Sequence, residues 1–314
     1  MCAFRPCFPR TATVASVPKP RSKRDELKAP APLREPPTVV LEIKVTTETT
    51  IRNLRVRVAG GTIDVRRQGQ RGPTLVFAHY WGGSAGTWDA VVERLPADRD
   101  TVRFDQRGWS SSQTLPGPYH LDQLADDLID VVEQLSLDRY VLVGHSMGGK
   151  VSQLAAARHP SGLAGLALLA PAPPQPPASV TPEYQQFLAH AYDSPQTVEQ
   201  ALHHALTATA LEGTVRDTVV RDSLASDAAP RHEWPLRGIA QDVTNAAKAI
   251  DVPVLVLAGE HDRVEPPHVL REHLLPHISH ARFNVIPGSG HLLPLEAPRT
   301  VVAALEDFNA GLSH

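Results

Sequence analysis

Cysteine is almost absent from this sequence. The 314 residues include two cysteines, Cys2 and Cys7, and none follows them. The rest of the chain therefore has no disulfide framework and no cysteine metal site. No apolar run approaches the roughly 20 residues that a membrane-spanning helix needs, and residues 1–20 lack the continuous apolar stretch of a secretory signal. We therefore expect no transmembrane segment.

A strong charge of either sign is also missing. The chain carries 31 Lys and Arg against 34 Asp and Glu, for a formal net charge of −3. Such a balance gives no general attraction to nucleic acid or to a membrane surface, so we expect neither as a partner. Hydrophobic residues make up 42% and charged residues 21% of the sequence, which is typical of a globular protein and excludes global disorder. A cytoplasmic location is our expectation.

Proline is in excess, and it is concentrated at the beginning of the chain. Residues 1–37 hold eight prolines and eight Lys and Arg, against three acidic residues. Proline removes the backbone donors that helices and sheets need. We predict that residues 1–37 form a disordered, basic tail that is dispensable for the fold. A targeting leader is the alternative, because this segment has no acidic residue before Asp25.

From about residue 38 the sequence becomes regular and indicates strands. Asn53–Val58 and Thr62–Arg66 alternate apolar and polar residues around Gly60 and Gly61, which predicts a hairpin with a half-exposed face. Nearly continuous apolar runs follow, and their length is typical of strands buried on both faces of a sheet. These runs are Thr74–Ala78, Thr101–Phe104, Tyr140–Val143, Leu163–Leu169, Val254–Ala258 and Ala281–Ile286.

Helical patterns lie between these runs. Apolar residues recur at steps of three and four in Leu121–Leu135, and Met147–Arg158 and Thr300–Leu312 show a similar periodicity. Alternating strands and helices predict an α/β fold, in which a mostly parallel sheet carries helices on both faces.

One long stretch breaks this alternation. Residues 171–182 contain six prolines, and the residues after them, 183–248, show helical patterns and no strand pattern. We interpret this stretch as a helical insertion between two strands. The expected helices are Glu183–Ala191, Thr197–Thr209, Thr214–Ala225 and Leu236–Lys248.

The most informative motif is the Gly-x-Ser-x-Gly of Gly144–Gly148, which runs from an apolar strand into an amphipathic helix. A serine nucleophile must sit on a very sharp turn to be exposed above a sheet. Such a turn brings neighbouring backbones close together, so the positions two before and two after the serine must be small. The motif is weak by itself, but the strand before it and the helix after it make Ser146 a strong candidate nucleophile.

A serine hydroxyl needs a base to take its proton, and that base needs a carboxylate to orient it. His291 lies in a glycine-rich loop after the last expected strand, and Asp262 lies just past the strand before it. Loops at the carboxyl ends of parallel strands are where the site of an open α/β sheet belongs. We therefore assign His291 as base and Asp262 as its partner, with Glu260 and Glu265 as rival carboxylates.

Negative charge that develops on the substrate needs backbone donors. The start of the helix after Ser146 offers the N–H of Met147. The loop after the Thr74–Ala78 strand reads His-Tyr-Trp-Gly-Gly-Ser, and Gly82 and Gly83 in it allow a close approach of the backbone to substrate. We assign the second donor to the N–H of Trp81.

Together these motifs resemble the α/β-hydrolase superfamily, in its esterase and perhydrolase-like branch. The resemblance runs from about residue 50 to 312, and the motifs fall in the family's order. They are His79–Gly83, Asp105–Gly108, Gly144–Gly148, Gly259–Asp262 and Gly290-His291. The resemblance places the nucleophile, acid and base on Ser146, Asp262 and His291, and the oxyanion donors on Trp81 and Met147.

The resemblance also implies a domain organisation. Residues 38–171 and 249–314 would form the hydrolase core, and residues 172–248 a helical cap that roofs the site and sets substrate choice. Two departures stand out, because Tyr80 replaces a usual glycine beside the oxyanion donor and Ser110 replaces a frequent glycine. We therefore include Tyr80 among the residues expected to shape the oxyanion and substrate-binding region.

The expected activity is that of a cofactor-free serine hydrolase. It would cleave a small or medium carboxylic ester or lactone through an acyl-enzyme. Perhydrolases (cofactor-free haloperoxidases) and C–C bond hydrolases share the same triad and remain alternatives. A small-molecule receptor on the hydrolase fold is the alternative from another class, because fold alone does not give function. No phosphate loop, dinucleotide fingerprint or metal-ligand spacing is found in the sequence.

Overall fold

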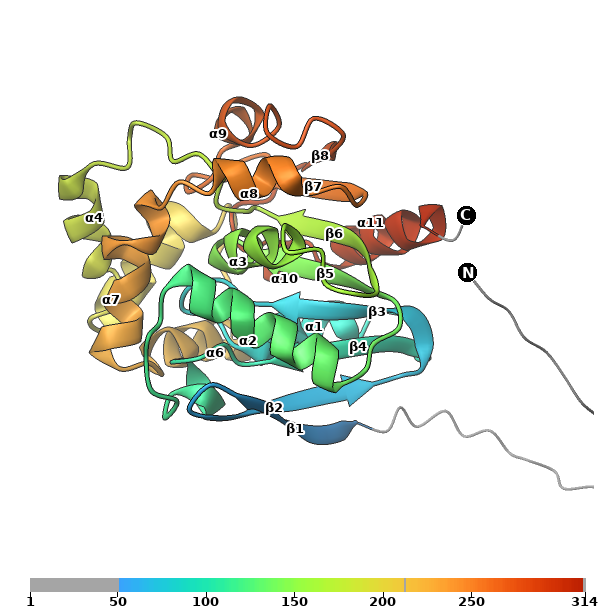
Figure 1. The fold of residues 1–314 in the computed structure, drawn as a ribbon. Coiled ribbons are helices and arrows are strands. Elements are labelled where there is room, and N and C mark those ends of the chain that lie inside the picture. The colour runs from blue at the N-terminus through green and yellow to red at the C-terminus, as the bar shows by residue number, and fades with distance from the viewer. Residues whose placement is uncertain (1–50, 212, 313–314) are drawn as a thin grey trace, which may run out of the picture. The chain divides into compact units, whose positions relative to one another are not determined.

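The computed structural model describes residues 51–211 and 213–312, so the predicted tail and the first residues of the predicted core lie outside the described residues. One sheet has the order β1-β2-β4-β3-β5-β6-β7-β8 (Figure 1). Its strands are β1 (Arg52–Val58), β2 (Gly61–Gln68), β3 (Arg71–Ala78), β4 (Arg99–Phe104), β5 (Tyr140–His145), β6 (Leu163–Leu169), β7 (Val254–Gly259) and β8 (Arg282–Ile286).

The sheet is parallel from β4 to β8, as the sequence predicts. The predicted hairpin is also confirmed, because β1 and β2 pair antiparallel from Arg52 opposite Arg67 to Val58 opposite Gly61. Strand β2 then pairs antiparallel with β4, which joins the hairpin to the parallel part. All other pairings between neighbouring strands are parallel.

Side chains that alternate along the buried strands build a hydrophobic core on each face of the sheet. Leu142 of β5 belongs to one core, whereas Val141 and Val143 belong to the other. The prediction of burial on both faces is right for β5 and β7, but it is wrong for the Ala281–Ile286 run. Strand β8 pairs only with β7 at the sheet edge, so its side chains alternate between exposed and half-buried until Ile286.

Helices cover both faces of the sheet, as expected (Figure 1). One layer contains α2, α3 and α8, which contact one another, and the opposite layer contains α1, α10 and α11. The bounds of these helices and of the short helices near them are η1 (Ala85–Trp88), α1 (Asp89–Val92), η2 (Ser110–Ser112), α2 (Leu121–Gln134), α3 (Met147–Ala156), α8 (Thr244–Ala249), α9 (Pro267–His273), α10 (Leu293–Glu296) and α11 (Pro298–Gly311).

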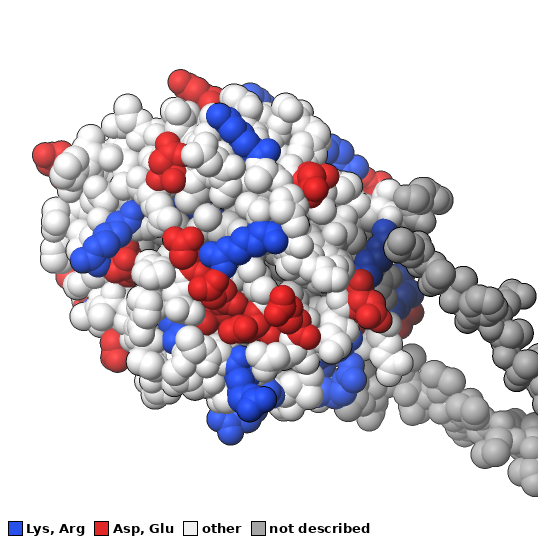
Figure 2. Space-filling model, viewed as in Figure 1, with Lys and Arg blue, Asp and Glu red and all other residues white. Residues whose placement is uncertain are grey.

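Charged residues of both signs lie on the face that Figure 2 shows. The outer side of α2 carries acidic side chains, among them Asp122 and Asp126, and Arg158 makes ion pairs with both. The opposite side of α2 is apolar and packs on the sheet, which follows from its three- and four-residue periodicity. Among residues 51–211 and 213–312, no helix has the length and apolar character required to cross a membrane.

A helical segment connects β6 to β7, as the broken alternation predicts. Residues 182–249 are here called the inserted segment. Its helices before α8 gather near the carboxyl ends of the parallel strands, whereas α8 lies beside α3 (Figure 1). The elements of the inserted segment, besides α8, are α4 (Pro182–Ala189), α5 (Pro195–Ala201), η3 (Leu202–Leu206), α6 (Gly213–Leu224), α7 (Ala228–Leu236) and η4 (Gly238–Ala240).

The expectation of one helix over Leu236–Lys248 is wrong. Helix α7 ends at Leu236, and α8 begins only at Thr244, with the short turn η4 between them. The side chain of Asp242 accepts a hydrogen bond from the backbone N–H of Thr244 at 2.8 Å. Short polar side chains compete in this way with helical hydrogen bonding, so Asp242 starts a new helix and does not continue the old one.

Candidate active site

Ser146 lies at a sharp turn between a strand and a helix. β5 ends at His145 and α3 begins at Met147, so the serine alone joins the two elements. Its backbone has φ of 53° and ψ of −116°, a strained conformation for a residue with a side chain. Its N–H donates to the carbonyl of Leu169 on β6 at 3.1 Å, which anchors the turn to the sheet.

The glycines around Ser146 are needed for close packing. A Cβ atom on Gly144 would lie 2.5 Å from the carbonyl oxygen of Gly148 and 2.6 Å from Oγ of Ser152. A Cβ atom on Gly148 would lie 2.4 Å from the carbonyl oxygens of both Ala78 and His79. Backbone atoms cannot move away cheaply, so the expectation that both positions must be small is met.

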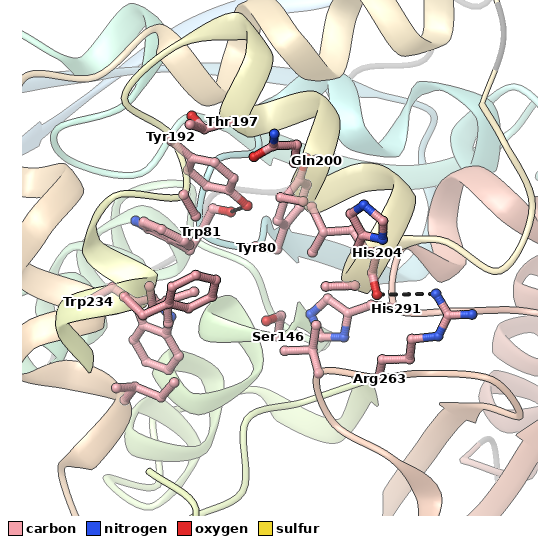
Figure 3. A pocket seen from close by; sticks show the side chains of 18 of the residues that line it. Tyr80, Trp81, Ser146, Tyr192, Thr197, Gln200, His204, Trp234, Arg263 and His291 are labelled. Carbon is pink, nitrogen blue, oxygen red and sulfur yellow. Dashed lines mark hydrogen bonds between the residues drawn. The ribbon is translucent and has the colours of Figure 1, made fainter. Parts of the chain in front are cut away.

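His291 and Asp262 come together from loops after the last two strands. Nδ1 of His291 donates to Oδ2 of Asp262 at 2.9 Å, and the two side chains are 2% and 0% exposed. With the proton on Nδ1, the Nε2 atom is free to accept one. Ser146 and His291 line the same cavity (Figure 3), and no hydrogen bond joins their side chains among the described residues.

The rival carboxylates do not contact His291 within the part of the chain that the structure describes. Glu260 is exposed and accepts a hydrogen bond from the backbone N–H of Gly288 at 2.9 Å. Glu265 is 5% exposed and lines the cavity. Oδ1 of Asp262 accepts from the backbone N–H of Glu265 at 2.9 Å, so Asp262 fixes this part of the loop while it also holds His291.

A buried histidine shapes the loop after β3. Nδ1 of His79 donates to the carbonyl of Tyr80 at 2.8 Å, and Nε2 accepts from the backbone N–H of Gln106 at 3.0 Å. Burial lowers the pKa of His79, and the Asp105 charge and the bond to Tyr80 oppose it. The neutral ring therefore fixes the direction in which the chain continues to Trp81.

The backbone N–H groups of Trp81 and Met147 have no hydrogen-bond partner among the described residues. Met147 is the first residue of α3, where backbone donors have no partner within a helix. Trp81 follows Tyr80, whose ring lies at 5.2 Å from that of His145, beneath the turn. Trp81, Tyr80 and Ser146 all line one cavity (Figure 3).

Aromatic rings fill the space beside Gly82 and Gly83. A Cβ atom on Gly82 would lie 2.4 Å from the ring of Tyr192, and one on Gly83 would lie 2.7 Å from the ring of Tyr80. The prediction that these glycines let the backbone approach substrate closely stays a prediction, and the close approaches that the structure shows are those of aromatic side chains. The glycines admit Tyr80 and Tyr192, and the ring of Tyr192 stacks on Trp81 with centroids 4.0 Å apart.

The inserted segment is tied to this loop by polar contacts. Oγ of Ser84 donates to Oδ2 of Asp222 on α6 at 2.6 Å, and both side chains are buried. Nε1 of Trp81 donates to the carbonyl of Arg231 on α7 at 3.0 Å. The position of the inserted segment therefore affects the loop that carries the Trp81 N–H.

A cavity of about 650 Å³ opens beside Ser146, and its wall is mostly aromatic and aliphatic. The inserted segment supplies Tyr184, Phe187, Tyr192 and Trp234, and Phe187 is 75% exposed. No local pattern in the sequence pointed to these wall residues, because neither the helices α4 and α7 nor the connection between α4 and α5 that carries Tyr192 has a distinctive motif. A cavity of this size and character suits a small organic molecule.

Several polar groups are buried next to this cavity. Burial, together with the charge of Asp262, raises the pKa of Glu265 well above its ordinary value, and Lys150 opposes this shift. Burial lowers the pKa of Lys150 to about 8, while Glu265 and Asp242 oppose that shift. Lys150 is fully buried on α3, and its Nζ donates to the carbonyl of Ile239 at 3.3 Å.

Two adjacent histidines, His203 and His204, lie on η3. Among the described residues, no group of three or more His, Cys, Asp or Glu is arranged to hold a metal ion. Nδ1 atoms of His203 and His204 lie 3.4 Å apart, and both residues are exposed. His204 also lines the cavity beside Arg263, whose guanidinium donates to its carbonyl (Figure 3).

Comparisons with known proteins agree with this fold. A family model described as the alpha/beta hydrolase fold matches residues 73–298, well over half of the chain. The protein therefore belongs to the alpha/beta hydrolase fold family, as its motifs predict, and this membership indicates a hydrolase.

Individual relatives are more distant. The chain is 27% identical over 244 residues to the bifunctional esterase/perhydrolase of Acinetobacter calcoaceticus, covering 73% of this chain and 88% of that one. It is 26% identical over 248 residues to 3-oxoadipate enol-lactonase 2 of Acinetobacter baylyi, covering 76% and 90%. A solved structure of a thermophilic esterase from Thermogutta terrifontis has a TM-score of 0.70 and 25% identity, covering 84% of this chain and 100% of that one.

Proposed function

We propose that this protein is a cofactor-free serine hydrolase that cleaves a small or medium carboxylic ester or lactone. The hydrogen bond between His291 and Asp262, at the wall of the cavity that Ser146 lines, is the observation that supports this most directly. Two relatives are named as an esterase/perhydrolase and an enol-lactonase, and these names describe ester and lactone substrates, which supports the same proposal.

In the proposed reaction, Oγ of Ser146 attacks the carbonyl carbon of the substrate. Nε2 of His291 takes the hydroxyl proton and then donates it to the leaving alcohol oxygen, which leaves an acyl group on Ser146. A water molecule then loses a proton to His291 and attacks the acyl carbon, which releases the acid and restores Ser146. Asp262 keeps Nδ1 protonated and stabilises the imidazolium.

The backbone N–H groups of Trp81 and Met147 would stabilise the oxyanion that forms in both steps. Each donor of this kind contributes about 3–4 kcal/mol to transition-state stabilisation in serine hydrolases. Both lack a partner in the described structure, so each is free to bind substrate oxygen. Tyr80 would act by packing under this loop, where its ring fills the space beside Gly83.

Residues 172–248, which contain nearly all of the inserted segment, would act as a cap. Residues 38–171 and 249–314 would form the hydrolase core beneath it. The cap would choose the substrate, because α4, α5 and α7 supply much of the cavity wall.

The test is Ser146→Ala, assayed with p-nitrophenyl butyrate and with a fluorophosphonate probe followed by peptide mapping. We expect kcat to fall by about 10⁴-fold or more, and the probe to label Ser146 in the wild type only. The exposed Ser161→Ala is the matched control and is expected to retain wild-type rates. Wild-type hydrolysis by the Ser146 variant would refute the proposal.

Perhydrolysis is a second candidate, and the bifunctional esterase/perhydrolase relative favours it. Here hydrogen peroxide would replace water in the attack on the acyl group of Ser146 and would give a peracid. Bromination of monochlorodimedone that requires both acetate and peroxide, and that Ser146→Ala abolishes, would support it. An absence of acetate dependence would exclude it.

A further inference from the structure

Glu265 is a buried carboxyl group that the proposed mechanism does not use. It lies in the loop between β7 and α9, three residues after Asp262, and is 5% exposed. Its backbone is held by the hydrogen bond to Oδ1 of Asp262, so the position of Glu265 is set by the same carboxylate that contacts His291. It lines the cavity that Ser146 lines.

The carboxyl oxygens of Glu265 have no partner among the described residues. The structure has no hydrogen bond to them from a described residue, and no Lys, Arg or His lies within 4.0 Å, so they form no ion pair. The side-chain oxygen of Gln106 is unpartnered and fully enclosed by protein atoms. The carboxyl oxygens of Glu265 differ from it, because they are not fully enclosed. Glu265 is buried and lines both this cavity and a neighbouring one of about 300 Å³, so its accessible carboxyl oxygens border these cavities.

The surroundings of Glu265 favour an uncharged carboxyl group. Burial and the negative charge of Asp262 both disfavour a second carboxylate here, and the buried Lys150 opposes them from beyond ion-pairing distance. An uncharged carboxyl group has one O–H donor and a carbonyl acceptor. Val264 and Ile239, which line the cavity with it, have no polar side-chain atom, and the hydroxyl group of Tyr184 makes no hydrogen bond to it among the described residues, although the charge of Glu265 contributes to the raised pKa of Tyr184.

We propose that Glu265 is a specificity residue whose carboxyl group hydrogen-bonds an uncharged hydroxyl group of the substrate inside the cavity. This inference rests on the proposed ester hydrolase function. A hydroxyl group fits because it can accept from the carboxyl O–H and donate to its carbonyl. An apolar substrate would leave the carboxyl group without water and without a partner, and a site of this kind discriminates strongly against such a ligand.

The surroundings of Glu265 favour a hydroxyl group on the substrate over an ammonium group or a carboxylate. A substrate ammonium group would require the carboxyl group to ionise beside Asp262 and would lie near the buried Lys150. A substrate carboxylate would bring a third acidic group to the same loop. A neutral hydroxyl group avoids both costs, since it pairs with Glu265 without adding charge to the cavity.

The experiment compares kcat/KM for esters that differ by one terminal group. One pair is p-nitrophenyl hexanoate and p-nitrophenyl 6-hydroxyhexanoate, and the other is hexyl acetate and 6-hydroxyhexyl acetate, so both sides of the ester bond are examined. We expect the wild type to prefer the hydroxylated ester of at least one pair by about tenfold or more. 6-Aminohexyl acetate serves as the cationic probe.

Two variants separate hydrogen bonding from shape. Glu265→Gln keeps a donor and an acceptor, so we expect the preference to stay within about threefold of wild type. Glu265→Met has a similar length without polar oxygens, so we expect the preference to disappear. Glu272→Met on α9 is the matched control, because its side chain is 72% exposed, and it should keep the wild-type preference. Melting temperatures of all variants report folding.

Three results would overturn the inference alone while esters are still cleaved. These are equal rates for both members of each pair in the wild type, equal behaviour of the Gln and Met variants, and a preference for 6-aminohexyl acetate. A wild type that hydrolyses none of the esters and whose Ser146 resists fluorophosphonate would instead overturn the proposed function together with this inference.

Discussion

The sheet end and the inserted segment build the same cavity from different kinds of structure. At the sheet end, Ser146, Asp262 and His291 follow the ends of β5, β7 and β8, and short backbone and side-chain hydrogen bonds hold them. In the inserted segment, residues on several short helices reach the cavity through packing. Strand ends therefore position the candidate chemistry, and helix packing positions the wall.

The two regions also differ in how many changes they tolerate. Around Ser146, a single added Cβ on Gly148 would meet two backbone carbonyls. In the inserted segment, Phe187 is 75% exposed at the cavity, and nothing in its packing fixes the residue type. The comparison indicates that changes in the inserted segment alter substrate range at a lower cost to the fold than changes at the sheet end.

The largest expected effect is at the sheet end, with Asp262→Asn. An amide cannot keep the proton on Nδ1 of His291 in the required tautomer, so we expect kcat to fall by about 10⁴-fold while the fold survives. Ester hydrolysis at several substrate concentrations measures this. Glu260→Gln, on the same loop but exposed, is the control. A comparable loss of kcat in this variant would show that Asp262 is not the specific partner of His291.

A smaller effect is expected where the two regions meet, with Asp222→Asn. This change weakens the buried, charge-assisted bond from Ser84 at 2.6 Å. We expect a loss of about 1–3 kcal/mol in unfolding free energy and about a tenfold lower kcat/KM, because the loop that carries Trp81 shifts. Urea denaturation and ester assays measure both. Asp217→Asn, 70% exposed on the same helix, should be silent, and equal losses would refute the coupling.

The last expected effect concerns pH and acts on stability. Burial lowers the pKa of both His79 and His145 below 6.5, so the unfolded chain binds protons that the folded chain does not. Stability should therefore fall as pH decreases below 6.5, by up to about 1.4 kcal/mol per pH unit for each imidazole. Melting temperatures between pH 7 and 5 should fall less for His145→Gln than for the wild type. The exposed His204→Gln should behave as wild type, and parallel curves for all three would contradict this reasoning.

The sequence was informative wherever a local pattern reports directly on geometry. The Gly-x-Ser-x-Gly motif, with a strand before it and a helix after it, predicted the turn at Ser146 because only glycine fits at both flanking positions. The order of the strands placed Asp262 and His291 in loops at the same sheet edge, where they form a hydrogen bond. The Leu236–Lys248 pattern failed because apolar periodicity does not reveal that Asp242 begins a new helix.

The amino-acid order determined the alternation of strands and helices, the family and the three residues that carry the candidate chemistry, since backbone geometry and periodicity act over short distances. Only the tertiary structure decided that Tyr192 and Trp81 stack, that β8 is an exposed edge and that Glu265 lines the cavity with no hydrogen-bond partner for its carboxyl group in the described part of the chain. Such contacts join residues far apart in the chain, and their energies depend on which surfaces meet.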